Sequence, residues 1–129
     1  MEAKDIMTRD VITVSPTLPV KTLANLLIKN QISGAPVADK KGKIVGVVSE
    51  TDLIAKKGKQ VKTIMSNKVI QITEETPVEE IARLMTAHKI RRLPVMRGKS
   101  LVGIVSRADV VGAIARGHHI ALHTPTYDL

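Results

Sequence analysis

The chain contains one pattern of residues twice, and this internal repeat limits the fold more than any other feature. Ile6–Val14 (IMTRDVITV) matches Ile64–Ile72 (IMSNKVIQI), and Gly46–Asp52 (GVVSETD) matches Gly103–Asp109 (GIVSRAD). Matches that keep their order along both copies indicate a duplicated unit. We therefore expect a first repeat at residues 1–58, a second repeat at residues 59–116 and a C-terminal tail at residues 117–129.

The hydrophobic periodicity predicts the same order of elements in each repeat. Short β-branched runs at residues 11–14 and 69–72 are typical of strands. Apolar residues at helical spacing follow them, from Val20 to Ile28 and from Val78 to Met85. The second of these helices begins with the pattern of a helix cap, formed by Thr76, Pro77 and Glu79.

A hairpin and a second helix complete each repeat. The hairpin strands are expected at residues 35–38 and 43–48, and again at 93–96 and 101–105, with an apolar-periodic segment after each hairpin. The fold class is therefore α+β, with the order strand, helix, strand, strand, helix in each repeat. A repeat of this size buries too little surface to be stable alone. We expect one pseudo-two-fold module in which the two repeats pack through their sheets.

The composition excludes several classes of site. The chain has no cysteine, which excludes disulfides, thiolate metal sites and cysteine nucleophiles. It has no Phe, no Trp and one Tyr, so it lacks the aromatic platforms that stack unpaired bases. No apolar run is long enough to span a bilayer and no signal peptide is present, so a cytoplasmic protein without membrane contact is expected. No catalytic motif is present either, so the chain is not expected to be an enzyme.

The duplication, the order of elements and the Gly-x-x-Ser-x-x-Asp signature together resemble the CBS domain, named after cystathionine β-synthase. Two copies resemble a CBS pair, or Bateman module, and the resemblance covers residue 5 to about residue 115. IMTRDVITVSP in the first repeat and HKIRRLPV in the second are further marks of this family. The resemblance implies an adenosine-containing ligand (AMP, ADP, ATP or S-adenosylmethionine) in the cleft between the repeats, a homodimer, and no required cofactor.

The signature residues Ser49 and Asp52, and Ser106 and Asp109, are the first candidates for ligand binding. A carboxylate can accept hydrogen bonds from both hydroxyls of a ribose. The serine hydroxyl and the free N–H groups of a helix start can bind a phosphate. The alternative is a local role, in which each serine caps a helix and each aspartate complements the helix dipole. The two roles are compatible.

Arginines distinguish the second repeat from the first. Arg91 and Arg92 precede its Leu-Pro-Val, and Arg107 lies inside its signature, where the first repeat has Glu50. The guanidinium group donates two parallel hydrogen bonds to a phosphate, and the resemblance places Arg91 and Arg92 at phosphate-contacting positions. We expect anionic ligands to prefer the second repeat. The alternative is that these arginines are solvated surface residues.

The resemblance also implies an apolar slot for the adenine. The positions that match the family are Ile12, Val14 and Ala35 in the first repeat, and Ile70, Ile72 and Leu93 in the second. Ordinary core packing is the alternative for each of them.

The C-terminal tail contains His119 and His123, which would share one face of a helix and so suggest a metal site. No third ligand is near, and Pro125 limits the helix. We therefore expect an ordinary tail and no metal.

Two functions remain from the sequence. The first is a stand-alone CBS-pair regulatory module that binds an adenosine-containing ligand and signals to a partner protein, whose identity the sequence does not give. The alternative is a basic scaffold, associated with nucleic acid or with proteins, that has no functional nucleotide site. The formal net charge of +8 is compatible with the second function. The lysines at residues 39–43 and 56–62, however, lie in an expected turn and an expected linker.

Overall fold

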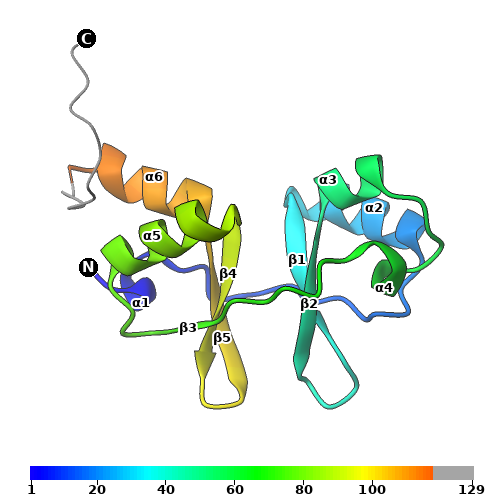
Figure 1. Ribbon diagram of the computed structural model, residues 1–129, viewed down its shortest axis with the longest axis horizontal. Helices are drawn as coiled ribbons and strands as arrows, with labels where there is room; N and C mark the ends of the chain where they lie inside the picture. The colour runs from blue at the N-terminus through cyan, green and yellow to red at the C-terminus, as the bar shows by residue number, and fades with distance from the viewer. Residues whose placement is uncertain (118–129) are drawn as a thin grey trace, which may run out of the picture. The chain divides into compact units, whose positions relative to one another are not determined.

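The computed structural model describes residues 1–117, which form two compact units (Figure 1). One unit contains residues 10–70, and the other combines residues 1–9 with the described residues from Gln71 onward. Each unit is built from the hairpin and the helices of one repeat, but it takes a short segment from the start of the other repeat. The division into units therefore differs from the division of the sequence into repeats.

The unit of residues 10–70 has a two-stranded antiparallel sheet. Buried and half-buried residues alternate along its second strand, so one face of the hairpin lies toward the core. The turn of the hairpin is fixed by Asp39, whose Oδ1 accepts hydrogen bonds from the N–H groups of Lys41 and Lys43, each at 2.9 Å. The elements of this unit are α2 (Val20–Asn30), β1 (Gly34–Ala38), β2 (Ile44–Ser49), α3 (Glu50–Ala55) and α4 (Val61–Ile64).

The other unit has a three-stranded sheet in the order β3-β4-β5. The first pair of strands is parallel and the second pair is antiparallel. One helix precedes its hairpin and another follows it, as in the unit of residues 10–70. Its elements are α1 (Ala3–Ile6), β3 (Ile72–Thr73), α5 (Val78–His88), β4 (Arg92–Arg97), β5 (Ser100–Ser106) and α6 (Arg107–Ala115).

The apolar faces of the long helices supply much of each core. On α5, the whole predicted face is buried: Val78, Ile81, Ala82 and Met85. On α2, Leu23 and Leu27 are buried, whereas Ile28 is 78% exposed although its spacing places it on the same face. The helical periodicity is therefore confirmed, and Ile28 is an apolar side chain left without a partner inside its unit.

The short helix α1 anchors the first nine residues on the unit of the second repeat. The N–H of Ala3 donates to the carbonyl of Thr76 at 2.8 Å. Thr8 and Ile104 exchange two backbone hydrogen bonds, both of 2.9 Å. The side chains of Ala3 and Ile6 are buried. Residues 1–9 are therefore part of this unit's core.

The helix α4 has the equivalent place in the other unit. The N–H of Val61 donates to the carbonyl of Leu18 at 2.9 Å, and Ser66 exchanges two backbone hydrogen bonds of 2.9 and 3.0 Å with Val47. Val61 and Ile64 are buried in the core cluster that also contains the apolar face of α2. The same hydrogen bonds therefore occur at equivalent positions of the two units. In both, the first residues of one repeat pack on the unit that is built mainly from the other repeat, and we call this the exchange of segments.

Two local expectations are corrected by the structure. Residues 11–14 do not form a strand but a single bridge from Val14 to Val37, and residues 69–72 give only the short β3. In each repeat, only the last residue of the β-branched run, Val14 or Ile72, pairs with a neighbouring strand. The predicted cap at Thr76 is also wrong, because α5 begins at Val78 after an N-cap Pro77. The Thr76 hydroxyl instead accepts a hydrogen bond from the N–H of Thr73 at 3.0 Å.

Candidate functional site

Both Ser-x-x-Asp signatures lie where a hairpin ends and a helix begins. Ser49 ends β2 and Ser106 ends β5, and the helices α3 and α6 follow directly. The N–H of Ser49 donates to Oδ2 of Asp52 at 2.9 Å, and the N–H of Ser106 donates to Oδ2 of Asp109 at 2.8 Å. The predicted local role is therefore confirmed, because each pair forms a capping box at the start of its helix.

The carboxylate of Asp52 has both of its oxygens engaged. Oδ2 accepts the capping hydrogen bond, and Oδ1 lies 3.0 Å from Nζ of Lys56. The same ammonium group donates to the carbonyl of Ile64 at 3.0 Å, so Lys56 connects the end of α3 to the end of α4. The Asp52 side chain is 15% exposed. A ligand that binds the Asp52 carboxylate therefore has to compete with Lys56 for one of its oxygens.

The carboxylate of Asp109 is engaged on one oxygen only. Oδ2 accepts from Ser106, and the N–H of Asp109 donates to Ser106 Oγ at 3.2 Å. Within residues 1–117, no hydrogen bond or ion pair reaches Oδ1 of Asp109. The residue that corresponds to Lys56, four positions after the aspartate, is Ala113. Both signatures thus form the same capping box. Within the described residues, Oδ1 of Asp109 is free to accept a hydrogen bond, whereas Oδ1 of Asp52 is paired with Lys56.

The glycine of each signature is required by packing inside its own unit. A Cβ atom on Gly103 would lie 2.5 Å from Sδ of Met7, and one on Gly46 would lie 2.7 Å from Sδ of Met65. The carbonyls of Thr8 and Ser66 are also close to these positions, at 3.1 and 2.8 Å. The glycines therefore let the exchanged segments approach the hairpins. Their presence does not by itself indicate a ligand.

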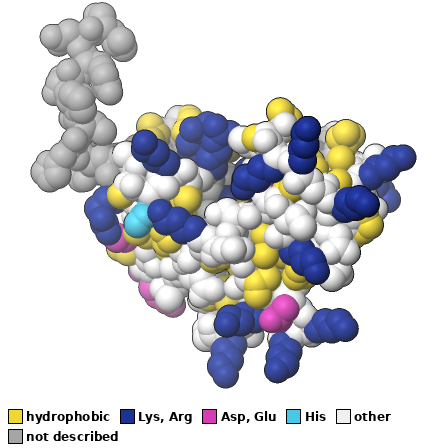
Figure 2. Space-filling view, turned by 45° about the vertical axis from the view of Figure 1, so that its right-hand side comes forward, with side chains coloured by type: hydrophobic (Ala, Val, Ile, Leu, Met, Phe, Trp, Pro, Cys, Tyr) yellow, Lys and Arg dark blue, Asp and Glu magenta, His cyan; other side chains and the backbone are white. Residues whose placement is uncertain are grey.

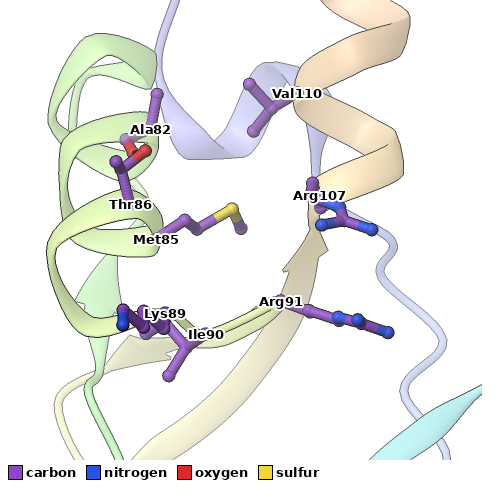
Figure 3. A pocket seen from close by; sticks show the side chains of 8 residues that line it. All are labelled: Ala82, Met85, Thr86, Lys89, Ile90, Arg91, Arg107 and Val110. Carbon is purple, nitrogen blue, oxygen red and sulfur yellow. Dashed lines mark hydrogen bonds between the residues drawn. The ribbon is translucent and has the colours of Figure 1, made fainter.

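The arginines of the second repeat lie around the start of α6. The N–H of Arg107 donates to the carbonyl of Arg91 at 2.8 Å, and the side chains of these two residues extend side by side (Figure 3). Both residues are exposed. Arg92 begins β4 and is the ladder partner of Ser106. The structure therefore brings Arg91, Arg92 and Arg107 together with the second signature, whereas the first repeat presents the exposed Glu50.

The predicted adenine slot is mostly occupied by core residues. Four of its members have little or no exposed surface: Val14 (5%), Ala35 (0%), Ile72 (5%) and Leu93 (0%). Ile12 and Ile70 are half-buried and lie outside the strands. Ile70 belongs to the unit of residues 10–70 and not to the unit that contains Ile72. Of these six positions, Ile12 and Ile70 therefore keep the most accessible apolar surface.

Several other sequence expectations concern sites away from the signatures. In the part of the chain that the structure describes, no group of three His, Cys, Asp or Glu side chains could hold a metal ion. The pair His119 and His123 lies outside the described residues. No helix within residues 1–117 is both long and apolar enough to cross a bilayer. Lys and Arg side chains are spread over the face shown in Figure 2, and Asp and Glu side chains are scarce on it.

Sequence reasoning missed the role of Lys56, which it placed in a linker. The spacing of Asp52 and Lys56 could have predicted their ion pair, because a carboxylate and a lysine four residues apart on a helix can interact. It also missed the pocket next to Arg91 and Arg107, which is lined by residues of α5 and α6. The apolar members of that pocket could be predicted as core residues, but not as the walls of a cavity.

Comparisons with known proteins agree with this geometry. A family model described as CBS domain matches the chain twice, at residues 3–58 and 61–116. Inosine-5'-monophosphate dehydrogenase of Methanocaldococcus jannaschii is 35% identical over 113 residues, which are 85% of this chain and 23% of the enzyme. The chain thus spans less than a quarter of the length of that relative.

Solved structures with the same fold include complexes with adenosine compounds. The CBS domain pair of protein MJ0100, in complex with 5'-methylthioadenosine and S-adenosyl-L-methionine, has a TM-score of 0.86 and 30% identity, covering 92% of this chain and 98% of that one. CBSX2 in complex with AMP has a TM-score of 0.80 and 32% identity, with coverage of 89% and 96%. These similarities confirm the predicted α+β fold with its tandem repeat.

Proposed function

Because the chain belongs to the CBS domain family, we propose that it is a regulatory module that binds an adenosine-containing ligand. Two similar structures support this proposal, since one was solved with AMP and the other with 5'-methylthioadenosine and S-adenosylmethionine. The ligand classes are AMP, ADP, ATP and S-adenosylmethionine. The module acts by binding and not by catalysis, and its ligand state is read by a partner protein.

The free oxygen of Asp109 is the observation that carries the proposal. Oδ1 has no partner within residues 1–117, while the capping box holds the rest of the carboxylate in place. A ribose can donate one hydroxyl to Oδ1 and the other to the remaining lone pair of Oδ2. Arg91 and Arg107 are exposed near this helix start and can donate to a phosphate. We therefore assign the stronger site to the second repeat.

The first repeat supplies a weaker site for anionic ligands. Lys56 already pairs with Oδ1 of Asp52, so a ribose hydroxyl has to compete with its ammonium group for that oxygen. Glu50 replaces Arg107 at the start of the helix, so the group nearest a bound phosphate would repel it. Both differences act in the same direction. We expect AMP to fill the site of the second repeat first.

Calorimetric titration of AMP, ATP, adenosine and S-adenosylmethionine into the full chain tests this function. We expect at least one of them to bind, and AMP to bind more tightly than adenosine because only AMP presents a phosphate to the arginines. Purine released from the purified protein and identified by mass would support the same conclusion. If no adenosine compound binds or is released, the proposal fails, and the basic scaffold becomes the better account of the charge.

We also propose that the chain forms a homodimer through apolar side chains on its helices. Four large apolar residues on α2, α3 and α6 are exposed: Ile28 (78%), Ile54 (87%), Val111 (56%) and Ile114 (49%). Contacts with a second copy would remove these side chains from water. Light scattering should give about twice the chain mass of 14.0 kDa.

Charged substitutions at these exposed apolar residues should dissociate the dimer. We expect Ile54→Lys and Ile114→Lys each to shift the mass toward the monomer. Lys99→Glu, in the turn between β4 and β5, is a matched exposed control and should leave the mass unchanged. A wild-type chain that stays monomeric with and without nucleotide would contradict the homodimer.

A further inference from the structure

A pocket of about 470 Å³ lies between α5 and α6, in the unit that contains the second repeat (Figure 3). Its size is in the range of small-molecule sites. It is distinct from the ribose contact proposed above, because neither Ser106 nor Asp109 lines it. The ribose contact therefore does not explain this pocket.

The inner walls of this pocket are apolar. Met85 from α5 and Val110 from α6 point toward one another across it, and Ala82 lies on the same wall as Met85 (Figure 3). These side chains are only 6–7% exposed, so they are part of the core as well as of the wall. A ligand with an apolar body would remove the remaining apolar surface from water.

The rim of the pocket is cationic. Arg91 and Arg107 line it near the start of α6, and Lys89 lines it at the end of α5 (Figure 3). Among residues 1–117, no carboxylate lines the pocket and no ion pair includes any of these three residues. The backbone hydrogen bond from Arg107 to Arg91 holds the main chains of these two cationic residues together. An anion between them would offset their repulsion.

The equivalent positions of the first repeat show that the fold does not need these charges. Gln31 corresponds to Lys89, and both residues hold the left-handed conformation at a helix end, with φ of 54°. Ser33 corresponds to Arg91, and Glu50 to Arg107. The apolar positions stay apolar, since Ala24, Leu27 and Leu53 replace Ala82, Met85 and Val110. The cationic rim is therefore specific to the second repeat.

We propose that this pocket binds a small amphipathic anion, with a compact apolar body and a single anionic head. The body lies between Met85 and Val110, and the head accepts hydrogen bonds from Arg91 and Arg107. This inference goes beyond the adenosine site, which needs the aspartate of the signature. The two ligands share the arginines, so each should weaken the binding of the other if it carries a phosphate.

Hexyl phosphate is a suitable probe, with inorganic phosphate and hexanol as its separate halves. Calorimetric titration into the full chain should show hexyl phosphate binding at least about tenfold more tightly than either half, a difference of about 1.4 kcal/mol. If all three compounds bind alike, or if hexyl phosphate does not bind, the proposal is wrong.

The variants test where the probe binds. Replacing the rim by its first-repeat equivalents, Lys89→Gln, Arg91→Ser and Arg107→Glu together, should weaken hexyl phosphate about tenfold or more. The replaced side chains are exposed, so the fold should be kept. Lys99→Gln with Arg116→Gln removes two exposed charges elsewhere and is the control. An equal loss of affinity in the control would show a general charge effect and would overturn the proposal.

Two further outcomes separate this pocket from the other proposals. Asp109→Ala should leave hexyl phosphate binding within about twofold of wild type, whether or not the chain binds AMP. A large loss in Asp109→Ala would place the probe in the adenosine site and overturn the separate pocket. If the triple variant changes the mass of the dimer and not the affinity for the probe, the groove is covered by a second copy and the proposal also fails.

Discussion

Single residues distinguish the two signatures, which share their glycine, serine and aspartate. Ser49 with Asp52 and Ser106 with Asp109 have the same spacing and form the same capping box, as the sequence predicts. The difference lies four residues further on, where Lys56 pairs with its aspartate and Ala113 cannot. The helical spacing alone allows this pair. That the ammonium group is also held by a carbonyl of α4 depends on tertiary structure and could not be predicted.

We expect Lys56→Met to strengthen the first-repeat site, because the change frees Oδ1 of Asp52 and keeps a long apolar side chain. Exposed ion pairs contribute up to about 1 kcal/mol, so the gain in adenosine affinity should be at most about fivefold. Calorimetric titration in an Asp109→Ala background isolates this site. Lys57→Met is the control, since the neighbouring lysine is exposed and outside the ion pairs found in residues 1–117. If Lys56→Met and Lys57→Met bind adenosine with equal affinity, Lys56 does not compete with the ligand for Asp52.

At the scale of elements, local patterns predicted the hairpins and the four longest helices. The apolar face of α5 and the alternation along β2 are visible in sequence because each element buries one face. The short α1 and α4 carry too few residues for a period to appear. The β-branched run at residues 11–14 looked like a strand, yet only Val14 finds a partner, because pairing is decided by the neighbouring strand and not by propensity.

At the scale of the whole molecule, each unit depends on a segment from the start of the other repeat. Val61 and Ile64 are buried in the unit of residues 10–70, and Ala3 and Ile6 are buried in the other unit. Removing a buried aliphatic side chain costs about 2–5 kcal/mol, and a missing segment removes several contacts at once. The sequence showed the duplication clearly. The sequence could not show that the first segment of each repeat packs on the other unit, because this packing depends on contacts between residues far apart along the chain.

Truncated chains test the exchange. A chain of residues 1–58 holds the first repeat but lacks α4, whereas a chain of residues 10–70 holds one complete unit. We expect residues 10–70, which keep the whole core of one unit, to show a weak cooperative thermal transition by circular dichroism, at a lower temperature than the full chain. Residues 1–58 should show no transition. The two chains have nearly the same length, so size does not explain a difference. Equal cooperativity in both would mean that the exchanged segments are not needed for folding.

The proposed contact between the carboxylate of Asp109 and the ribose of an adenosine ligand can be tested by comparing three chains. AMP is titrated calorimetrically into the wild-type chain, Asp109→Ala and Asp52→Ala. A ribose contact to a carboxylate contributes about 1.5–3 kcal/mol, so Asp109→Ala should weaken AMP at its tighter site about ten- to a hundredfold. Asp52→Ala, which removes the same capping group from α3, should leave that site within about twofold of wild type. If both variants bind AMP like the wild-type chain, or lose it equally, the account is contradicted.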